Sequence, residues 1–172
     1  LDTARVFVPL GIAVLTVSDT RTLADDRSGD TLAERLTQAG HRLAARAIVP
    51  DEVEAIRGQV KAWAEDPGVD VVITTGGTGF TGRDVTPEAT EAVCEKMMPG
   101  FGELFRMVSY HEIGPAAMLS RACAGITRGR VLFVLPGSQN AVALAMNKLV
   151  LPELGHIVSE LTKGGPLDGV DA

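Results

Sequence analysis

Residues 69–89 read VDVVITTGGTGFTGRDVTPEA, an apolar run that passes through a glycine-rich loop into a helix start. The run Val69 to Ile73 is typical of a buried strand. Four glycines in the seven residues 76–82 let the backbone approach a ligand closely, and several can take positive φ. Their amides can then point at an anion. This stretch therefore predicts a strand, an anion-binding loop and a helix in direct succession.

Asp84 directly follows the loop, at its junction with the next helix. A carboxylate at such a junction can hold a metal or act as a base. Thr86 is predicted to cap the next helix, with Pro87 in its first position. Strand, glycine loop, acid and helix together indicate a site for a phosphorylated ligand with a divalent cation. The formal net charge is −6, so a phosphate group would need its charge offset, and Mg²⁺ is the expected counterion.

On both sides of this stretch, apolar strands alternate with amphipathic helices along the chain. Strands are predicted at 11–18, 43–49, 69–75 and 131–135. Helices are predicted around Leu32 and Leu36, around Ile56, Val60 and Trp63, at 87–97, around 101–108, and from about 139 to 161. Unbroken apolar strands between helices favour an α/β sandwich with a mostly parallel sheet. The 172 residues are expected to form one domain, 1–172, with its core at about 10–162 and loose termini.

Ligands of such sheets bind at the carboxyl ends of the strands. The loops expected there are 18–29, 49–52, 76–86 and 136–139. Asp51 and Asp84 each follow a predicted strand and precede a helix, so both can lie on one rim of the sheet. Each acid can equally serve only to favour a helix N-terminus. Gly137 and Ser138 begin a helix whose N-terminus suits an anion. The end of the first long loop, 25–29, is expected to order over a ligand.

The sequence disfavours several other classes of binding site and of protein. The loop matches G-x-G-x-x-G formally, but a dinucleotide site would open its helix directly, and no P-loop motif is present. The acidic balance argues against nonspecific nucleic-acid binding. No segment is expected to span a membrane and no signal peptide is recognised, so a cytoplasmic location is expected. Cys94 and Cys123 lack a metal-binding spacing and are expected to be buried, reduced thiols.

Taken together, these motifs resemble the MoaB/Mog family of molybdenum cofactor biosynthesis proteins over roughly residues 10–162. The resemblance is carried by VLTVSDTR at 14–21, DRSG at 26–29, TTGGTGFTGRDVTPEA at 74–89 and LPGSQNA at 135–141. The segments GFGELFRM at 100–107 and MLSR at 118–121 are also family-like, and the first is closest to the MoaB branch. Gln139 departs from the family pattern, which often has proline there.

The resemblance implies a three-layer α/β/α sandwich that assembles as a trimer or hexamer. Active members adenylylate molybdopterin: its terminal phosphate attacks the α-phosphorus of Mg-ATP, giving adenylyl-molybdopterin and pyrophosphate. Two family aspartates linked to catalysis and Mg²⁺ match Asp51 and Asp84. The remaining candidates for ligand binding are Ser18 and Asp19 on the nucleotide side, Gly76, Gly77, Thr78 and Gly79 in the loop, Ser120 and Arg121 for the molybdopterin phosphate, and Gly137 and Ser138.

Some MoaB-type proteins have uncertain activity, so the alternative is a non-catalytic molybdopterin-binding or scaffold protein. A generic nucleotide-binding α/β protein is a third hypothesis. The expected partners are molybdopterin, ATP, further copies of the chain and the molybdenum insertion protein. The apolar stripe of Phe101, Leu104, Phe105 and Val108 is expected to lie in the core or between subunits.

Overall fold

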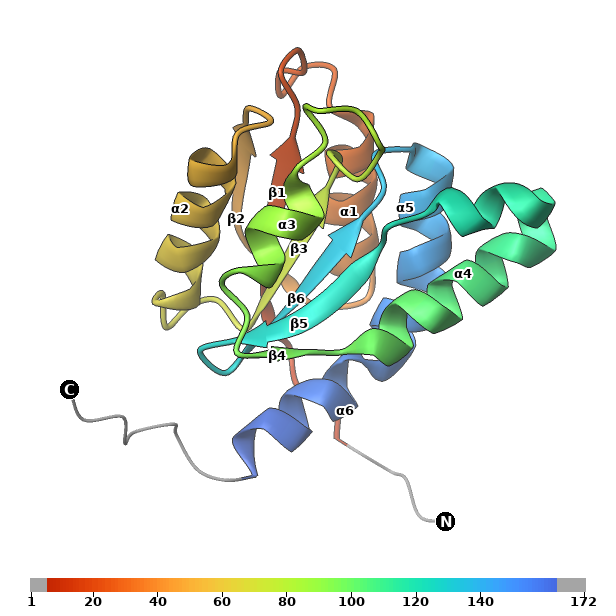
Figure 1. The fold of residues 1–172 in the computed structure, drawn as a ribbon. Helices are drawn as coiled ribbons and strands as arrows, with labels where there is room; N and C mark the ends of the chain where they lie inside the picture. Colours follow the sequence, from red (N-terminus) through yellow and green to blue (C-terminus); the bar gives the residue numbers. More distant parts are fainter. Residues whose placement is uncertain (1–5, 164–172) are drawn as a thin grey trace.

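The computed structural model describes residues 6–163 and contains one mixed sheet with helices on both sides (Figure 1). The strand order is β2-β1-β3-β6-β5-β4. The strands are β1 (Gly11–Val17), β2 (Arg42–Val49), β3 (Val71–Thr75), β4 (Lys96–Met97), β5 (Cys123–Thr127) and β6 (Arg130–Leu135). Of the termini expected to be loose on either side of about 10–162, residues 1–5 and 164–172 lie outside the described residues, whereas Phe7 contacts His41 and Leu10 is buried in the core. The predicted α/β sandwich is confirmed.

Four strands form the parallel part of the sheet. β1 pairs in parallel with β2 and with β3, and β3 pairs in parallel with β6. Every residue of β1 and β3 is buried, which is why both were recognisable as unbroken apolar runs. The chain moves outward from β1 to β2 and then returns to the other side of β1 with β3. The order therefore reverses between β1 and β3, which makes their carboxyl ends the favoured ligand site.

The other edge of the sheet differs from the prediction. β5 pairs antiparallel with β6, and β4 pairs antiparallel with β5. The helix predicted at 87–97 is wrong in length, because α3 spans only Thr86–Glu91. Beyond it the chain leaves the helix and joins the sheet, where the Glu95 amide donates to the Ile126 carbonyl at 2.9 Å. Pairing with a distant strand has overridden local helix propensity here.

Helices cover both faces of the sheet (Figure 1). One core packs α1 (Arg27–Gln38), α4 (Pro99–Ile113), α5 (Gln139–Ala145) and α6 (Leu151–Thr162) on one face of the strands. The other core packs α2 (Val53–Ala64) and α3 on the opposite face, with Trp63 buried as predicted. Along β1 the side chains alternate between the two cores, Ile12 and Val14 against Ala13 and Leu15. The sheet therefore forms the middle layer of three.

The last helical stretch runs from Gln139 to Thr162 through a π-helical turn, η2 (Met146–Val150). By length and composition alone this stretch could cross a membrane, because an 18-residue window within it has a mean hydropathy of 1.3. This finding contradicts the expectation that no segment could span a membrane by its composition. Its apolar face, however, belongs to the core: Val142, Met146 and Leu154 are fully buried against the sheet. The hydropathy of this stretch is accounted for by packing within the fold.

Candidate functional site

A cavity of about 170 Å³ opens at the carboxyl ends of β1 and β3, at the reversal of strand order. It is lined by Thr16, Val17, Ser18, Arg21, Asp26, Arg27, Ser28, Thr75, Gly76 and Gly137. Three predicted residues, Ser18, Gly76 and Gly137, lie in this lining. Asp26, Arg27 and Ser28 belong to the segment 25–29 that was expected to order over a ligand, whereas Thr16 and Thr75 were not predicted as ligand contacts. The motifs VLTVSDTR and TTGGTGFTGRDVTPEA, in which the two threonines lie, were the signal in the sequence that could have found them.

The glycine loop begins with two residues in the left-handed region, Gly76 at φ 96° and Gly77 at φ 71°. A Cβ on Gly76 would lie 2.4 Å from the Val17 carbonyl oxygen, and one on Gly77 would lie 2.2 Å from Thr86 Oγ1. Both positions therefore require glycine for two reasons: the positive φ and the close approach of a neighbouring oxygen atom. The Gly76 amide donates to the Leu135 carbonyl at 3.1 Å. The expectation that this amide binds phosphate does not fit, because it is already used to fasten the loop to β6.

Asp84 lies at the far end of the loop and closes a turn with Thr81. Its Oδ2 accepts hydrogen bonds from Thr81 Oγ1 at 2.7 Å and from the Thr81 amide at 2.9 Å. These bonds, together with one from the Gly79 amide, hold the pKa of Asp84 below its usual value. Asp84 is therefore an ionised carboxylate with a fixed direction at neutral pH.

Asp51 follows β2 on the same rim of the sheet. Burial raises its pKa above the usual value, and the charges of Asp19 and Asp84 raise it further. Thr86, beside it, is not the helix cap that was predicted: α3 begins at Thr86 itself, and its buried Oγ1 has no hydrogen-bond partner among residues 6–163. A Cβ built on Gly77 would lie near both Thr86 Oγ1 and Asp51 Oδ1, at 2.2 and 3.1 Å. These two oxygens thus flank the same space.

Asp19 joins three loops instead of lining the cavity. Its carboxylate accepts from Arg83 Nε at 3.0 Å and Nη2 at 2.9 Å, and from the Asp51 amide at 2.9 Å. The hydrogen bonds from Arg83 lower the pKa of Asp19, so it remains charged. Ser18, by contrast, does face the cavity, and its hydroxyl accepts from the Thr20 and Arg21 amides. Of these two neighbouring residues, Asp19 therefore connects loops, and Ser18 lines the cavity.

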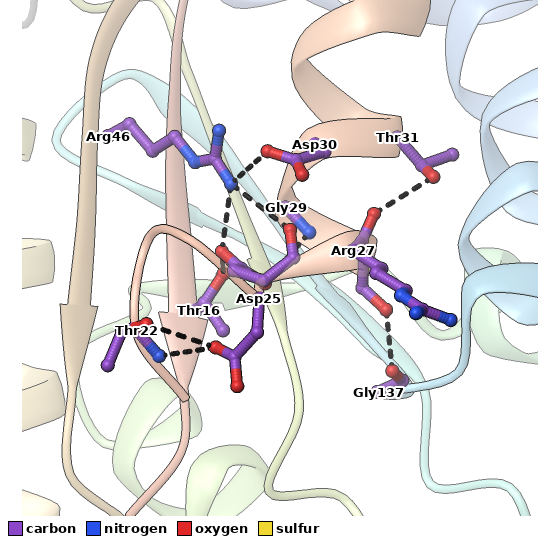
Figure 2. A network of polar contacts seen from close by, with 11 residues as sticks. Thr16, Thr22, Asp25, Arg27, Gly29, Asp30, Thr31, Arg46 and Gly137 are labelled. Atoms are coloured by element: carbon purple, nitrogen blue, oxygen red, sulfur yellow. Dashed lines mark hydrogen bonds and ion pairs between the residues drawn. The ribbon is translucent and has the colours of Figure 1, made fainter. Parts of the chain in front are cut away.

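The segment 25–29, which was expected to order over a ligand, does lie at the cavity, but most of it belongs to α1, which begins at Arg27. Asp26 caps that helix, with its side chain accepting from the Gly29 amide at 3.0 Å, and it is only 2% exposed. It also accepts from Thr16 Oγ1 at 2.7 Å and pairs with Arg46 at 3.1 Å (Figure 2). A buried carboxylate needs such partners. This network anchors the start of α1 against β1 and β2.

The turn before α5 meets α1 across the cavity. Ser28 Oγ donates to the Gly137 carbonyl at 2.7 Å, a contact visible beside Arg27 and Gly137 in Figure 2. Ser138 is the N-cap of α5, and its hydroxyl accepts from the Ala141 amide at 3.2 Å. Gln139, the departure from the family pattern, donates to Thr31 Oγ1 at 3.2 Å. The side chain of Gln139 thus adds a tie to α1 that a proline lacks.

Arg121 and Ser120 precede β5 on the other side of the glycine loop. Ser120 Oγ accepts from the Ala122 amide at 3.3 Å. The Arg121 guanidinium lies on the loop itself, donating to the carbonyls of Thr78 and Gly79. Thr78 is buried and takes part through its backbone. The predicted loop residues and Arg121 are therefore brought together, while Ser120 hydrogen-bonds within its own turn.

The oxygen donors near the loop can supply part of the coordination shell of Mg²⁺. Within residues 6–163, no group of three or more His, Cys, Asp or Glu side chains could hold a metal ion. Mg²⁺ is usually bound by one or two carboxylates, with substrate phosphates and waters completing its shell. Asp51, Asp84 and the unpartnered Thr86 hydroxyl supply oxygen donors of that kind. The site suits a cation that arrives with a phosphorylated ligand.

The two cysteines do not contribute a nucleophile. Cys94 and Cys123 are both free and half-buried, where full burial was expected. Burial is the main cause that raises the pKa of Cys94 to about 12 and that of Cys123 to about 11. Each is therefore a thiol at neutral pH, and thiols are poor nucleophiles. Both pack beside the core that contains α2 and α3.

Comparison with known proteins agrees with this fold. Residues 13–156 match the family model described as a probable molybdopterin binding domain. The molybdenum cofactor biosynthesis protein B of Bacillus cereus is 55% identical over 149 residues, which cover 86% of this chain and 88% of the relative. A crystal structure of a molybdenum cofactor biosynthesis protein B matches with a TM-score of 0.89 at 52% identity, covering 91% of this chain and 98% of that one.

A more distant structural relative is the tungsten cofactor synthesizing protein MoaB from Pyrococcus furiosus. It has a TM-score of 0.76 at 38% identity and covers 89% of this chain and 97% of its own. The α/β sandwich with its glycine loop thus belongs to the family of molybdopterin-binding domains. Within that family, the chain is a molybdenum cofactor biosynthesis protein of the MoaB type.

Proposed function

We propose that the chain is a molybdopterin adenylyltransferase, which converts Mg-ATP and molybdopterin to adenylyl-molybdopterin and pyrophosphate. The observation that carries the proposal is that both acids border the start of the glycine loop, Asp51 beside Gly77 and Asp84 beside Gly79, close enough for the charge of Asp84 to raise the pKa of Asp51. In this reaction an oxygen of the molybdopterin phosphate forms a bond to the α-phosphorus of ATP. The bond from the α-phosphorus to the bridging oxygen breaks, and pyrophosphate leaves with that electron pair.

Such a reaction needs positioning and charge neutralisation more than a protein nucleophile, since the substrate phosphate is the nucleophile. The thiols of Cys94 and Cys123 are protonated at neutral pH and are not required. Asp51 and Asp84 would hold Mg²⁺, which supplies positive charge to the phosphates when bound. The glycine loop would bring backbone close to those phosphates.

The electrostatics of Asp51 support a cation at this rim. Its pKa is raised by burial and by two neighbouring carboxylates, so its negative charge is less stable there than on an exposed aspartate. A divalent cation beside it would reverse that effect, because an opposite charge favours the ionised form. Mg²⁺ would thus offset both the acids of the protein and the phosphates of the ligand.

The cavity between β1 and β3 is assigned to part of one substrate. Ser18, Gly76 and Gly137 line it, and Arg21 and Arg27 add two cationic side chains that suit an anionic ligand. We assign Ser18 to the nucleotide side, as the family resemblance implies. Asp19 would act there indirectly, by tying Arg83 to the Asp51 turn.

The test is turnover of the purified protein with molybdopterin and Mg-ATP under anaerobic conditions, beside Asp51→Ala and Asp84→Ala. Adenylyl-molybdopterin formed by the wild type and lost in both variants would support the enzyme and its metal-binding acids. Molybdopterin binding without any product would instead favour the non-catalytic scaffold. Binding of unrelated nucleotides with similar affinity would favour a generic nucleotide-binding protein.

The assembly and its partners are part of the proposal. Within residues 6–163, α4 and the following 3₁₀ helix η1 (Gly114–Leu119) expose a row of large apolar side chains: Leu104, Met107, Tyr110, Ile113, Met118 and Leu119. We infer that further copies of the chain cover this row in a trimer or hexamer. We also propose a cytoplasmic location and transfer of the product to the molybdenum insertion protein.

A further inference from the structure

Arg121 donates four hydrogen bonds to backbone carbonyls of the glycine loop. Its Nε donates to the carbonyls of Thr78 at 3.2 Å and Gly79 at 3.0 Å. Its Nη2 donates to the carbonyls of Gly79 at 2.7 Å and Asp84 at 3.0 Å. Its Nη1 donates to the carboxylate of Glu88 on α3. One guanidinium therefore joins both ends of the loop segment 78–84 to the first turn of α3.

The number of donors limits what else Arg121 can bind. A guanidinium has five N–H groups in a fixed plane. The contacts above use the single N–H of Nε, both N–H groups of Nη2 and one of the two on Nη1. Bidentate binding of a phosphate would have to break contacts to the loop. The side chain is also only 25% exposed, which restricts approach from solvent.

The contacts of Arg121 fix the loop at the residue that matters for the proposed chemistry. Asp84 is held on two sides, through its carbonyl by Arg121 and through its carboxylate by Thr81. The Arg121 guanidinium also lies over the Phe80 ring, 5.7 Å from its centre, which adds a cation–π contact to a further residue of the loop. A loop with this many glycines has high conformational entropy, so it needs such a tether to stay in one geometry.

We propose that Arg121 is a positioning residue that orders residues 78–84 and aims Asp84, instead of a ligand for the molybdopterin phosphate. The clamp depends on the planar fork of arginine, which reaches several carbonyls at once, whereas lysine offers its donors from a single nitrogen. Lysine would keep the charge that a phosphate ligand needs but not the clamp. The proposal deepens the proposed function, and only its kinetic test rests on that function.

The decisive variants are Arg121→Lys and Arg121→Gln, each read by hydrogen exchange of the backbone amides at 78–84. We expect exchange there to speed up about tenfold or more in both variants, with the central strands unchanged. Arg130→Lys is the matched control, because Arg130 also donates to backbone carbonyls, those of Val69, Arg128 and Asp66, but lies at the start of β6, at the end of the sheet away from the loop. If Arg121→Gln does not fold, the lysine variant decides alone.

Molybdopterin binding and turnover provide the second readout. A positioning role predicts that kcat falls in Arg121→Lys while KM and Kd for molybdopterin stay within about twofold of the wild type. Wild-type exchange at 78–84 in both variants would overturn the proposal, and so would a loss of molybdopterin affinity in Arg121→Gln that Arg121→Lys restores. If the wild type forms no product, the proposed function fails, but exchange and binding still decide the role of Arg121.

Discussion

At the scale of single residues, Asp84 combines a structural and a chemical task. Its Oδ2 closes the turn with Thr81, and its charge belongs to the proposed cation site. Asparagine keeps one side-chain oxygen as an acceptor but removes the charge, so Asp84→Asn separates the two tasks. The pKa of Asp84 lies below its usual value, so the charge lost by this substitution is fully present at neutral pH.

We therefore expect Asp84→Asn to lower kcat for adenylyl transfer by about a hundredfold or more, a loss typical of removing electrostatic stabilisation. The free energy of unfolding should change by about 1 kcal/mol or less, because the turn persists. Asp66→Asn is the matched control: Asp66 also closes a short turn, accepting from the Gly68 amide at 2.7 Å, but lies between α2 and β3, away from the loop. Normal turnover in Asp84→Asn would remove Asp84 from the site.

His41 gives the molecule a pH dependence that is independent of the site. It is 8% exposed, its Nδ1 accepts from the Leu10 amide at 3.1 Å, and burial lowers its pKa from 6.5. The folded protein thus binds this proton less tightly than the unfolded chain does. The stability that neutral His41 contributes is complete above pH 6.5 and is lost as the pH falls through 6.5 towards the lower folded pKa.

His41→Asn keeps a side-chain oxygen for the Leu10 amide but cannot titrate. We expect the variant to lose less stability than the wild type on acidification from about pH 7.5 to pH 5, with a difference of about 1 kcal/mol or less. Urea unfolding at both pH values measures the difference. His111→Asn, at an exposed histidine of α4, serves as the control and should follow the wild type. Equal losses in wild type and His41→Asn would contradict the assignment.

At the scale of elements, the glycine loop contains positions with opposite requirements. Gly77 has φ 71° and would place a Cβ 2.2 Å from Thr86 Oγ1, whereas no atom of the described part of the chain lies within 4 Å of a Cβ on Gly82. We expect Gly77→Ala to cost about 1–3 kcal/mol through backbone strain and the clash. Gly82→Ala should be neutral or stabilising by up to about 1 kcal/mol, because it restricts the unfolded chain. Denaturant unfolding of the pair tests the contrast, and equal effects would refute it.

The sequence predicted those elements whose patterns are local. β1, β3 and β6 were identified because each is an unbroken apolar run, and α1 and α2 because their buried residues recur at helical spacing. β4 is only two exposed residues, Lys96 and Met97, and it exists only because it pairs with β5. No local pattern encodes such an edge strand, so a longer helix was predicted in its place.

The candidate site was predictable to a similar degree. Glycines and acids that follow strands stand out in the sequence, so the loop, Asp51 and Asp84 were found as candidates, and their roles stay predictions. Asp26 looked like part of a polar surface loop, yet it is buried because Thr16 and Arg46, far from it in the sequence, supply its partners. The burial of a carboxylate depends on non-local contacts of this kind and is not visible in composition.

At the scale of the whole molecule, the two cores bury most of the large apolar side chains, but α4 also carries apolar residues that neither core buries. The predicted stripe divides: Phe101 and Phe105 are buried against the sheet, while Leu104 is 48% exposed. The exposed row continues through Met107, at 52%, into η1. A monomer rarely presents so continuous an apolar surface without a partner. The exposed row on α4 thus favours contact between identical chains, in which α4 of each subunit lies at an interface.

We expect the wild type to sediment at three or six times the chain mass of 18.1 kDa. Introducing charge into the row, as in the double variant Met107→Glu and Ile113→Glu, should dissociate it, because an unpaired carboxylate is costly to bury at an interface. Leu23→Glu is the matched control, since Leu23 is equally exposed but lies in the loop after β1. Sedimentation velocity distinguishes the outcomes. A wild-type monomer at micromolar concentration would contradict the assembly, and an intact oligomer of the double variant would place its interface elsewhere.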